Sequence, residues 1–488
     1  MSERAGQLFV CGFDGTEVNE NIRFLIHEKR IAGVIIFRRN IASRVQLKQL
    51  TADLQREAKR AGYTKPLLIT LDEECGTVSR LEGLIPPFPG AMLQAATGDE
   101  QLIYDIHYAL AAELRELGIN WNLAPVADIQ NNAQNPVIGV RSFGEQPKQV
   151  GALAVQAVKG QQQNGVIATL KHFPGHGDTA VDSHVGLPVI PHDEARLHAV
   201  ELEPFKQGIA ENVDCIMAAH IHFPQFDEDI LPASISPKVI QGLLRDQLGF
   251  KGSVITDCME MHAIMDSFGT AEACIRAVQA GVDFLLVSHT FTVQCEAIEA
   301  VEQAIIQGRI TEAQLQQAVA RIEQTAERAK QPYTMNSGHC QLAVQAFEQG
   351  VTLLNARPQK WRIPLRIVLI GADNKTIAED AVSLPYTISK ATAEPLQWLT
   401  VEEAIALQQP CIVITQNAMD SAAHREQMQL LEQTAMDFAV IAVKKPYDAA
   451  LTTRPVICTY EPSVQALQVA FAQLLHDQPS TGRLPVTI

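Results

Sequence analysis

Residues 7–37 read QLFVCGFDGTEVNENIRFLIHEKRIAGVIIF. An apolar run from Gln7 to Phe13 is followed by an amphipathic run from Val18 to Lys29 and by a second apolar run from Ala32 to Phe37. Short apolar, β-branched runs are typical of buried strands, and apolar residues at helical spacing are typical of helices. The order strand, helix, strand therefore predicts two parallel strands joined by a helix.

The same alternation continues through the first 290 or so residues. Further strands are expected at 66–71, 119–129, 165–170, 215–221, 253–255 and 284–288, and helices at 45–60, 100–117, 147–163, 194–211, 237–247 and 271–280. Eight strands at this spacing predict a (β/α)8 barrel, in which functional side chains follow the carboxyl ends of the strands. Polar residues fall there in many different loops, as at Asp72, Asp128, Lys171, His172 and Asp257. A doubly wound open sheet would place them in fewer loops.

Helical patterns at 293–307 and 311–330 complete this part, and periodicity is lost from Gln331 to Gly338. A second alternating pattern then predicts a smaller α/β sandwich with a mainly parallel sheet. We expect a catalytic barrel domain at 1–332, a linker at 333–345 and the sandwich domain at 346–488. Gly371-Ala372-Asp373 follows a strand but lacks the glycine fingerprint of dinucleotide sites, so no nucleotide is expected there.

Composition limits the function classes. The chain has 488 residues and a formal charge of −16, and we find no basic patch, which argues against nucleic acid or an anionic membrane as the main partner. No apolar run is long enough to span a bilayer, and residues 1–6 lack the pattern of a signal peptide. The nine cysteines are scattered singly, without metal-binding spacing, so reduced thiols in the cytoplasm are expected.

Polar chemistry is concentrated in residues 170–179, LKHFPGHGDT, and in Asp182-Ser183-His184. Single histidines and aspartates in a Gly/Pro-rich loop are usually only solvated. A lysine, three histidines and two aspartates within one short stretch indicate a functional site instead. Asp182 stands two residues before His184, so its carboxylate can hold one imidazole nitrogen while the other faces a substrate.

A second acid follows a strand in Ile255-Thr256-Asp257-Cys258. Asp257 could be the N-cap of the next helix, because aspartate is a preferred capping residue. It could also be a nucleophile. Retaining glycoside hydrolysis needs a carboxylate that attacks the anomeric carbon and an acid that protonates the leaving oxygen.

These motifs resemble those of glycoside hydrolase family 3, and within it the NagZ-type β-N-acetylglucosaminidases. The resemblance implies a barrel in which Asp257 forms a covalent glycosyl-enzyme and His184, held by Asp182, acts as general acid and then general base. It further implies five residues that bind sugar hydroxyls, namely Asp72, Arg80, Arg141, Lys171 and His172. For Arg80, a salt bridge that only holds loops together is an alternative.

One segment departs from the family pattern. Where the family has Gln-Glu-Gly-Gly-Arg after the first aspartate, this chain has Glu73-Glu74-Cys75-Gly76-Thr77. The change adds a negative charge and a thiol and removes a cation. Cys75 and Cys258 both neighbour site residues, and we interpret them as packing groups.

The implied activity is that of a retaining exo-β-N-acetylglucosaminidase. It would release terminal GlcNAc from cell-wall-derived oligosaccharides or muropeptides in the cytoplasm, as in peptidoglycan recycling. The expected partner is a small carbohydrate. No cofactor is expected. No metal is expected either, since the sequence supplies no third ligand at suitable spacing to complete a zinc site with His220 and His289. The alternatives are a β-glucosidase or a GlcNAc phosphorylase of the same family, and a sugar-binding homologue without catalysis.

Overall fold

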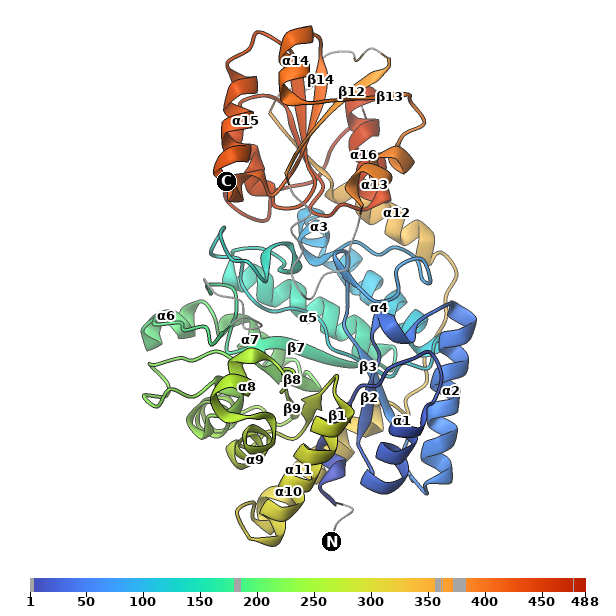
Figure 1. Cartoon of the computed structure of the whole chain (residues 1–488), viewed down its shortest axis with the longest axis vertical. Helices are drawn as coiled ribbons and strands as arrows, with labels where there is room; N and C mark the ends of the chain where they lie inside the picture. The colour runs from blue at the N-terminus through green and yellow to red at the C-terminus, as the bar shows by residue number, and fades with distance from the viewer. Residues whose placement is uncertain (1–3, 180–185, 356–360, 362, 372–382, 477) are drawn as a thin grey trace.

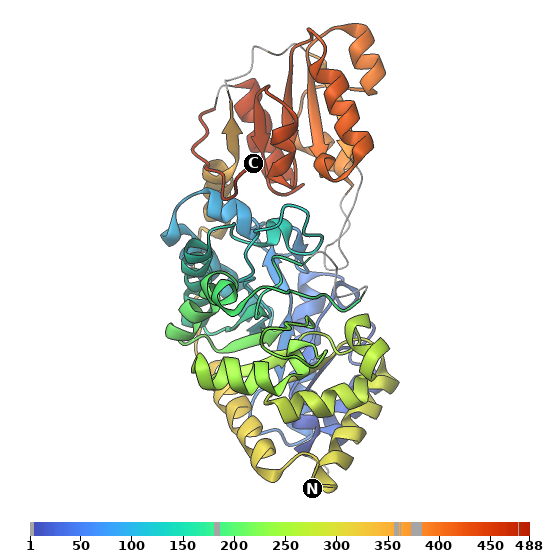
Figure 2. The same ribbon diagram turned by 90° about the vertical axis from the view of Figure 1, so that its left-hand side faces the viewer.

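The computed structural model describes residues 4–179, 186–355, 361, 363–371, 383–476 and 478–488. Its first part is a barrel of parallel strands surrounded by helices, and its second part is a smaller layered domain stacked on one end of the barrel (Figure 1). A view from the side shows the two parts one above the other along the long axis (Figure 2). Within the described residues, no helix combines the length and the apolarity that a bilayer span requires.

The barrel sheet has the strand order β10-β1-β2-β3-β6-β7-β8-β9, and its pairs are parallel. A parallel bridge between Ile255 and Phe284 brings its two outer strands together. The strands are β1 Phe9–Cys11, β2 Gly33–Ile35, β3 Leu68–Leu71, β6 Trp121–Asn122, β7 Ile167–Phe173, β8 Cys215–Ala218, β9 Ser253–Thr256 and β10 Leu285–Val287. The predicted (β/α)8 barrel is confirmed.

Helices cover the outside of this sheet, because their apolar faces pack on the strands (Figure 1). They are α1 Glu20–Phe24, α2 Arg44–Arg60, α4 Glu100–Glu116, α5 Pro147–Gln163, α6 Glu194–Ala199, α7 Glu203–Ala210, α8 His262–Phe268, α9 Thr270–Ala280, α10 Phe291–Ile306 and α11 Glu312–Arg328. The short helix α3 Ala91–Ala96 instead lies between the barrel and the second domain. Two π-helical segments, Leu25–Lys29 and Lys238–Gln247, complete the ring.

Several expected boundaries in the barrel were wrong, and the strand expected at 119–129 is only the two-residue β6. The strand expected to end at Leu170 continues to Phe173, because the polar groups of Lys171 and His172 are buried against acidic partners and do not end the strand. The helix expected at 194–211 is divided into α6 and α7. Pro204 in the first turn of α7 cannot donate the backbone hydrogen bond that a continuous helix needs.

The second domain is built on the sheet order β11-β16-β15-β14-β12-β13, parallel except where β11 runs antiparallel to β16. Its elements are α12 His339–Gly350, β11 Thr352–Leu354, β12 Leu365–Gly371, α13 Leu384–Ala391, β13 Leu396–Leu399, α14 Val401–Leu407, β14 Cys411–Gln416, α15 Ala422–Glu432, β15 Phe438–Ala442, β16 Val456–Cys458 and α16 Val464–Leu475. The mainly parallel sheet is confirmed. The sequence did not predict β11, β13 and α13; β13 is an edge strand whose residues are all at least partly exposed.

The two domains share packed and hydrogen-bonded contacts. Leu93 of α3 is buried in the core of the second domain. Glu461 of the second domain accepts a hydrogen bond from the Gly90 amide at 2.7 Å through Oε2. A Cβ on Gly76 would lie 2.8 Å from the same oxygen, and the φ of Gly76 is +59°, so this position requires glycine.

Burial raises the pKa of Glu461 to about 7 from an ordinary value of 4.5, although the Gly90 amide opposes this shift. The folded protein thus binds the proton more tightly than the unfolded chain, and stability is lost as the pH rises through about 7. Glu461→Gln keeps an acceptor for Gly90 but carries no charge. The free energy of unfolding of the unmutated protein should fall by about 3 kcal/mol between pH 5 and pH 8, and that of the variant should not. Urea unfolding at the two pH values measures this difference.

Glu426→Gln, on an exposed position of α15, is the matched control and should change stability little at either pH. An equal effect of Glu461→Gln at both pH values would contradict the prediction.

Candidate active site

A cavity of ≈ 470 Å³ opens at the carboxyl ends of the barrel strands. Six residues that the sequence predicted for the site line it together: Asp72, Arg80, Arg141, Lys171, His172 and Asp257. They belong to β7 or follow the strands β3, β5 (Val78–Ser79) and β9, and Arg141 lies in the loop before α5. Asp182 and His184 lie outside the described residues.

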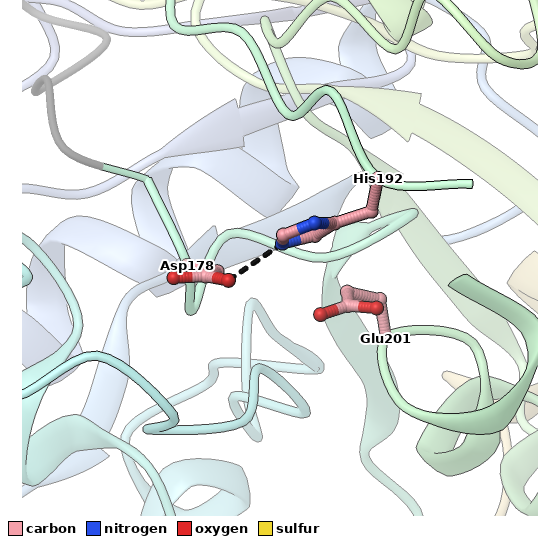
Figure 3. Close-up of side chains that lie close together, drawn as sticks. All are labelled: Asp178, His192 and Glu201. Atoms are coloured by element: carbon pink, nitrogen blue, oxygen red, sulfur yellow. Dashed lines mark hydrogen bonds and ion pairs between the residues drawn. The ribbon is translucent and has the colours of Figure 1, made fainter. Parts of the chain in front are cut away.

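The loop after β7 is held in place by side chains from neighbouring loops. Asn135 donates hydrogen bonds from Nδ2 to the carbonyl oxygens of His176 and Gly177, both at 2.9 Å. Further along, Oδ2 of Asp178 lies 2.6 Å from Nε2 of His192 (Figure 3). The described part of the predicted polar stretch is therefore an ordered wall beside the cavity.

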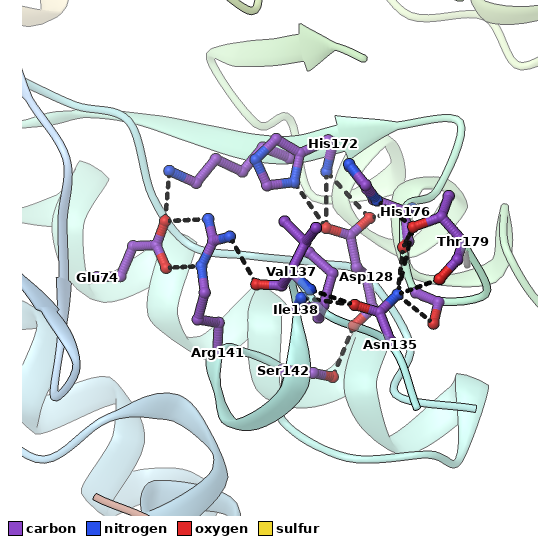
Figure 4. Close-up of polar contacts among 12 residues, drawn as sticks. Glu74, Asp128, Asn135, Val137, Ile138, Arg141, Ser142, His172, His176 and Thr179 are labelled. Atoms are coloured by element: carbon purple, nitrogen blue, oxygen red, sulfur yellow. Dashed lines mark hydrogen bonds and ion pairs between the residues drawn. The ribbon is translucent and has the colours of Figure 1, made fainter. Parts of the chain in front are cut away.

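Glu74 is shared by two cations at the base of the cavity (Figure 4). Arg141 donates to both of its oxygens, from Nε at 2.8 Å and from Nη2 at 2.7 Å. Lys171 lies 2.6 Å from Oε1 of Glu74 and 2.8 Å from Oδ1 of Asp72. These two acids and two bases form a network that we call the Glu74 network.

The Glu74 network is charged in spite of its burial. Burial alone would raise the pKa of Glu74, but Arg141 and Lys171 outweigh it and hold that pKa well below its usual value. Burial opposes the charge on Lys171 too, yet Asp72 and Glu74 raise its pKa. Asp72 has the most exposed side chain of the four, at 19% against 2% for Lys171. Asp72 is thus the member best placed to meet a bound molecule.

Asp128 organises the histidines of the β7 loop (Figure 4). Its carboxylate accepts from the backbone amides of His172 and His176, the latter at 2.6 Å, and lies 2.7 Å from Nδ1 of His172. Burial would raise the pKa of Asp128, but the two histidines and their hydrogen bonds lower it. For His176, burial and the charge of His172 lower the pKa to about 4, so its ring is neutral near pH 7.

Asp257 follows β9 and faces the cavity. Its Oδ1 accepts a hydrogen bond from the Cys258 amide at 2.7 Å. The next helix, α8, starts at His262 and has Met261 as its N-cap, without a capping side chain. The interpretation of Asp257 as a helix cap is therefore wrong, and Asp257 is instead part of the cavity lining.

The departure at Glu73–Thr77 lies in a hairpin of β4 Glu73–Cys75 and β5 Val78–Ser79. Alternate side chains of a strand point to opposite faces. Glu74 and Arg80 face the barrel mouth, whereas Glu73, Cys75 and Thr77 line a separate cavity of ≈ 560 Å³ against the second domain. The altered residues thus stand outside the wall of the barrel cavity.

The groups around Glu73 and the cysteines are structural. Glu73 accepts from Ser79 Oγ and the Leu81 amide, both at 3.1 Å, and burial raises its pKa to about 7. Burial raises the pKa of Cys258 to about 11, so it is a neutral thiol near pH 7. His220 contacts Ser234 Oγ at 2.7 Å and the Cys258 carbonyl at 3.0 Å through its two ring nitrogens.

Sequence reasoning assigned no role to Glu74, Asp128 or His176. The position of Asp128 after a strand was the available signal for it. For Glu74 the signal was the family pattern, which has a glutamate at that place. Neither signal identifies a partner, because Arg141 and Lys171 are distant in sequence.

Comparison with known proteins gives a consistent result. The model of the glycosyl hydrolase family 3 N terminal domain matches residues 1–325. β-Hexosaminidase A of Pseudoalteromonas piscicida is 37% identical over 334 residues, covering 64% of this chain and 56% of that protein. A β-hexosaminidase of Stenotrophomonas maltophilia is 37% identical over 301 residues, covering 60% of this chain and 87% of that protein.

The chain therefore spans little more than half of the first relative and most of the second. Among solved structures, a glycoside hydrolase family 3 β-N-acetylglucosaminidase from Paenibacillus sp. has a TM-score of 0.91 and 35% identity. That similarity covers 100% of this chain and 98% of the other. It extends over both domains.

The Glu74 network yields a stability prediction. Glu74→Gln leaves Arg141 without a buried counter-charge, and breaking a buried ion pair from one side is costly. We expect a loss of about 3 kcal/mol in the free energy of unfolding, measured by denaturant titration at pH 7.

The control is Glu211→Gln, which removes an exposed ion pair with Lys159 and should cost about 0.5 kcal/mol or less. If Glu74→Gln lost no more free energy of unfolding than Glu211→Gln, the prediction would be contradicted.

Proposed function

Because the chain belongs to glycosyl hydrolase family 3, we propose that it is a retaining exo-β-N-acetylglucosaminidase. It would release terminal GlcNAc from cell-wall-derived oligosaccharides or muropeptides. The observation that carries this proposal is that Asp257 and the Glu74 network line one cavity. At ≈ 470 Å³, this cavity lies in the size range of pockets for small molecules. The β-hexosaminidase names of the relatives support the same activity.

In the proposed reaction, a carboxylate oxygen of Asp257 attacks the anomeric carbon of the sugar. The bond from that carbon to the aglycone oxygen breaks as protonated His184 gives its proton to the leaving oxygen. Water then gives a proton to His184, and its oxygen attacks the anomeric carbon and releases Asp257. Asp182 would hold the ring of His184. An imidazole suits both steps because its ordinary pKa of about 6.5 lies near neutrality.

The described flanks of 180–185 support this role. His176 lines the cavity and Thr179 is buried close behind it, so the chain enters that segment from the cavity wall.

Sugar binding is assigned to Asp72, Arg80, Arg141, Lys171 and His172. Asp72 would accept from sugar hydroxyls, since its side chain is the most open of the network. Lys171 is nearly buried and already bound to two carboxylates, so one ammonium N–H remains for the sugar. Charge-assisted hydrogen bonds of this kind fix the orientation of a polar ligand.

A role in cytoplasmic peptidoglycan recycling is part of the proposal. All nine cysteines are free, as expected in a reducing compartment.

The nucleophile can be tested by covalent trapping. A 2-fluoro derivative of the substrate sugar should label the protein once, and mass spectrometry should find the label on the peptide that contains Asp257. Asp257→Ala should lower kcat/KM by about 10⁴-fold or more with p-nitrophenyl GlcNAc. Asp246→Ala, an exposed aspartate of the barrel, is the control and should be as active as the unmutated protein. Full activity of Asp257→Ala would contradict the proposal.

The acid/base group and the sugar can be tested by substrate choice. His184→Ala should lose about 10² to 10⁴-fold in turnover of substrates with a poor leaving group, because the aglycone oxygen then lacks a proton donor. Faster cleavage of p-nitrophenyl glucoside than of p-nitrophenyl GlcNAc would favour a β-glucosidase. Formation of GlcNAc 1-phosphate in phosphate buffer would favour a phosphorylase. Sugar binding without turnover would favour an inactive homologue.

A further inference from the structure

Three potential metal ligands meet beside the β7 loop, outside the cavity described above (Figure 3). Asp178 follows β7, His192 stands just before α6, and Glu201 lies between α6 and α7. One ligand atom from each lies within 4.8 Å of the others. The three side chains thus converge from three separate points of the chain.

Glu201 carries an unsatisfied oxygen. The residue is only 3% exposed. Its Oε1 accepts from Asn131 Nδ2 at 3.2 Å and from Arg196 Nη2 at 3.1 Å. Among the described residues, its Oε2 has no hydrogen-bond partner, and neither has the buried Oδ1 of Asn131. Buried acceptors without a partner are costly, so each such atom requires an explanation.

The charge balance of the cluster is incomplete as well. Two carboxylates, Asp178 and Glu201, face one guanidinium, since Arg196 Nη2 lies 3.8 Å from Asp178 Oδ2 and 3.1 Å from Glu201 Oε1. The Arg196 side chain is 38% exposed, and its Nε is buried. Because one guanidinium balances only one of the two carboxylates, a further positive charge would be compensated at this cluster.

We propose that Asp178, His192 and Glu201 bind a divalent cation, and that Zn²⁺ is the ion their chemistry fits. An imidazole nitrogen and two carboxylate oxygens are ligands that zinc accepts at about 2.0–2.2 Å, with water as a fourth ligand. The 2.6 Å contact between His192 and Asp178 would open slightly to admit the ion. The ion would also supply the missing partner for Oε2 of Glu201.

Such an ion would join both ends of the segment 179–191 to the α6–α7 connection. Gly175, at the start of the same loop, already packs on Glu201, since a Cβ there would lie 3.0 Å from Glu201 Cβ. Resting on the proposed function, this makes Asp178, His192 and Glu201 positioning residues for the segment to which Asp182 and His184 belong. Metal binding itself does not depend on that function.

The test uses the full chain stripped with a chelator and titrated with ZnCl₂, with binding followed by calorimetry and bound zinc measured by elemental analysis. We expect one tightly bound ion per chain. His192→Ala and Glu201→Gln should each weaken binding about tenfold or more. Arg196→Gln should bind zinc more tightly than the unmutated chain, because a competing positive charge is removed.

The matched control is His198→Ala, on α6 itself, where the ring lies 3.7 Å from the exposed Glu194 and meets the Phe226 ring edge to face. It should bind zinc as the unmutated chain does. If His192→Ala and Glu201→Gln bound zinc as tightly as the unmutated chain, the zinc would lie elsewhere and the proposal would be overturned. The absence of zinc binding would overturn it too, and so would weaker zinc binding by Arg196→Gln.

Binding and turnover separate the two proposals. If zinc binds as expected while Asp257→Ala is fully active, the site stands and the proposed function fails. If Asp257 is essential and zinc does not bind, the function stands and the site fails.

Discussion

The candidate active site depends on one buried carboxylate. Glu74 compensates the buried charges of Arg141 and Lys171 together, and it is the carboxylate with which Arg141 forms its ion pair. Its place on the inner face of the β4–β5 hairpin fixes where both cations point. Lys171 in turn holds Asp72 at the cavity edge. The polar surface proposed to bind the sugar is thus a consequence of electrostatic compensation within the barrel.

Much of the fold followed from periodicity. Alternating apolar and amphipathic runs predict the parallel barrel because a buried strand and a covering helix have different spacings of apolar residues. The rule failed where polar side chains are compensated by distant partners, as at Lys171, or where a strand lies at an edge, as in β13. Such cases depend on three-dimensional neighbours, which a single sequence does not display.

The site was predictable to a similar depth. Polar residues after strands identified the loops, and the family resemblance selected Asp72, Arg141 and Asp257, which the structure brings into one cavity. The role of Glu201 was hidden, because an isolated acid in a loop has no distinguishing pattern, and the position of Asp128 after a strand did not reveal its partners. The importance of these two acids comes from burial and from the groups around them, such as the two backbone amides that donate hydrogen bonds to Asp128.

The β4–β5 hairpin belongs to two compartments at once, since Glu74 faces the barrel mouth while Thr77 faces the second domain. For protein engineering, this makes Thr77 a suitable anchor for a fluorescent probe. A dye attached there would report on the separation of the two domains from outside the barrel cavity.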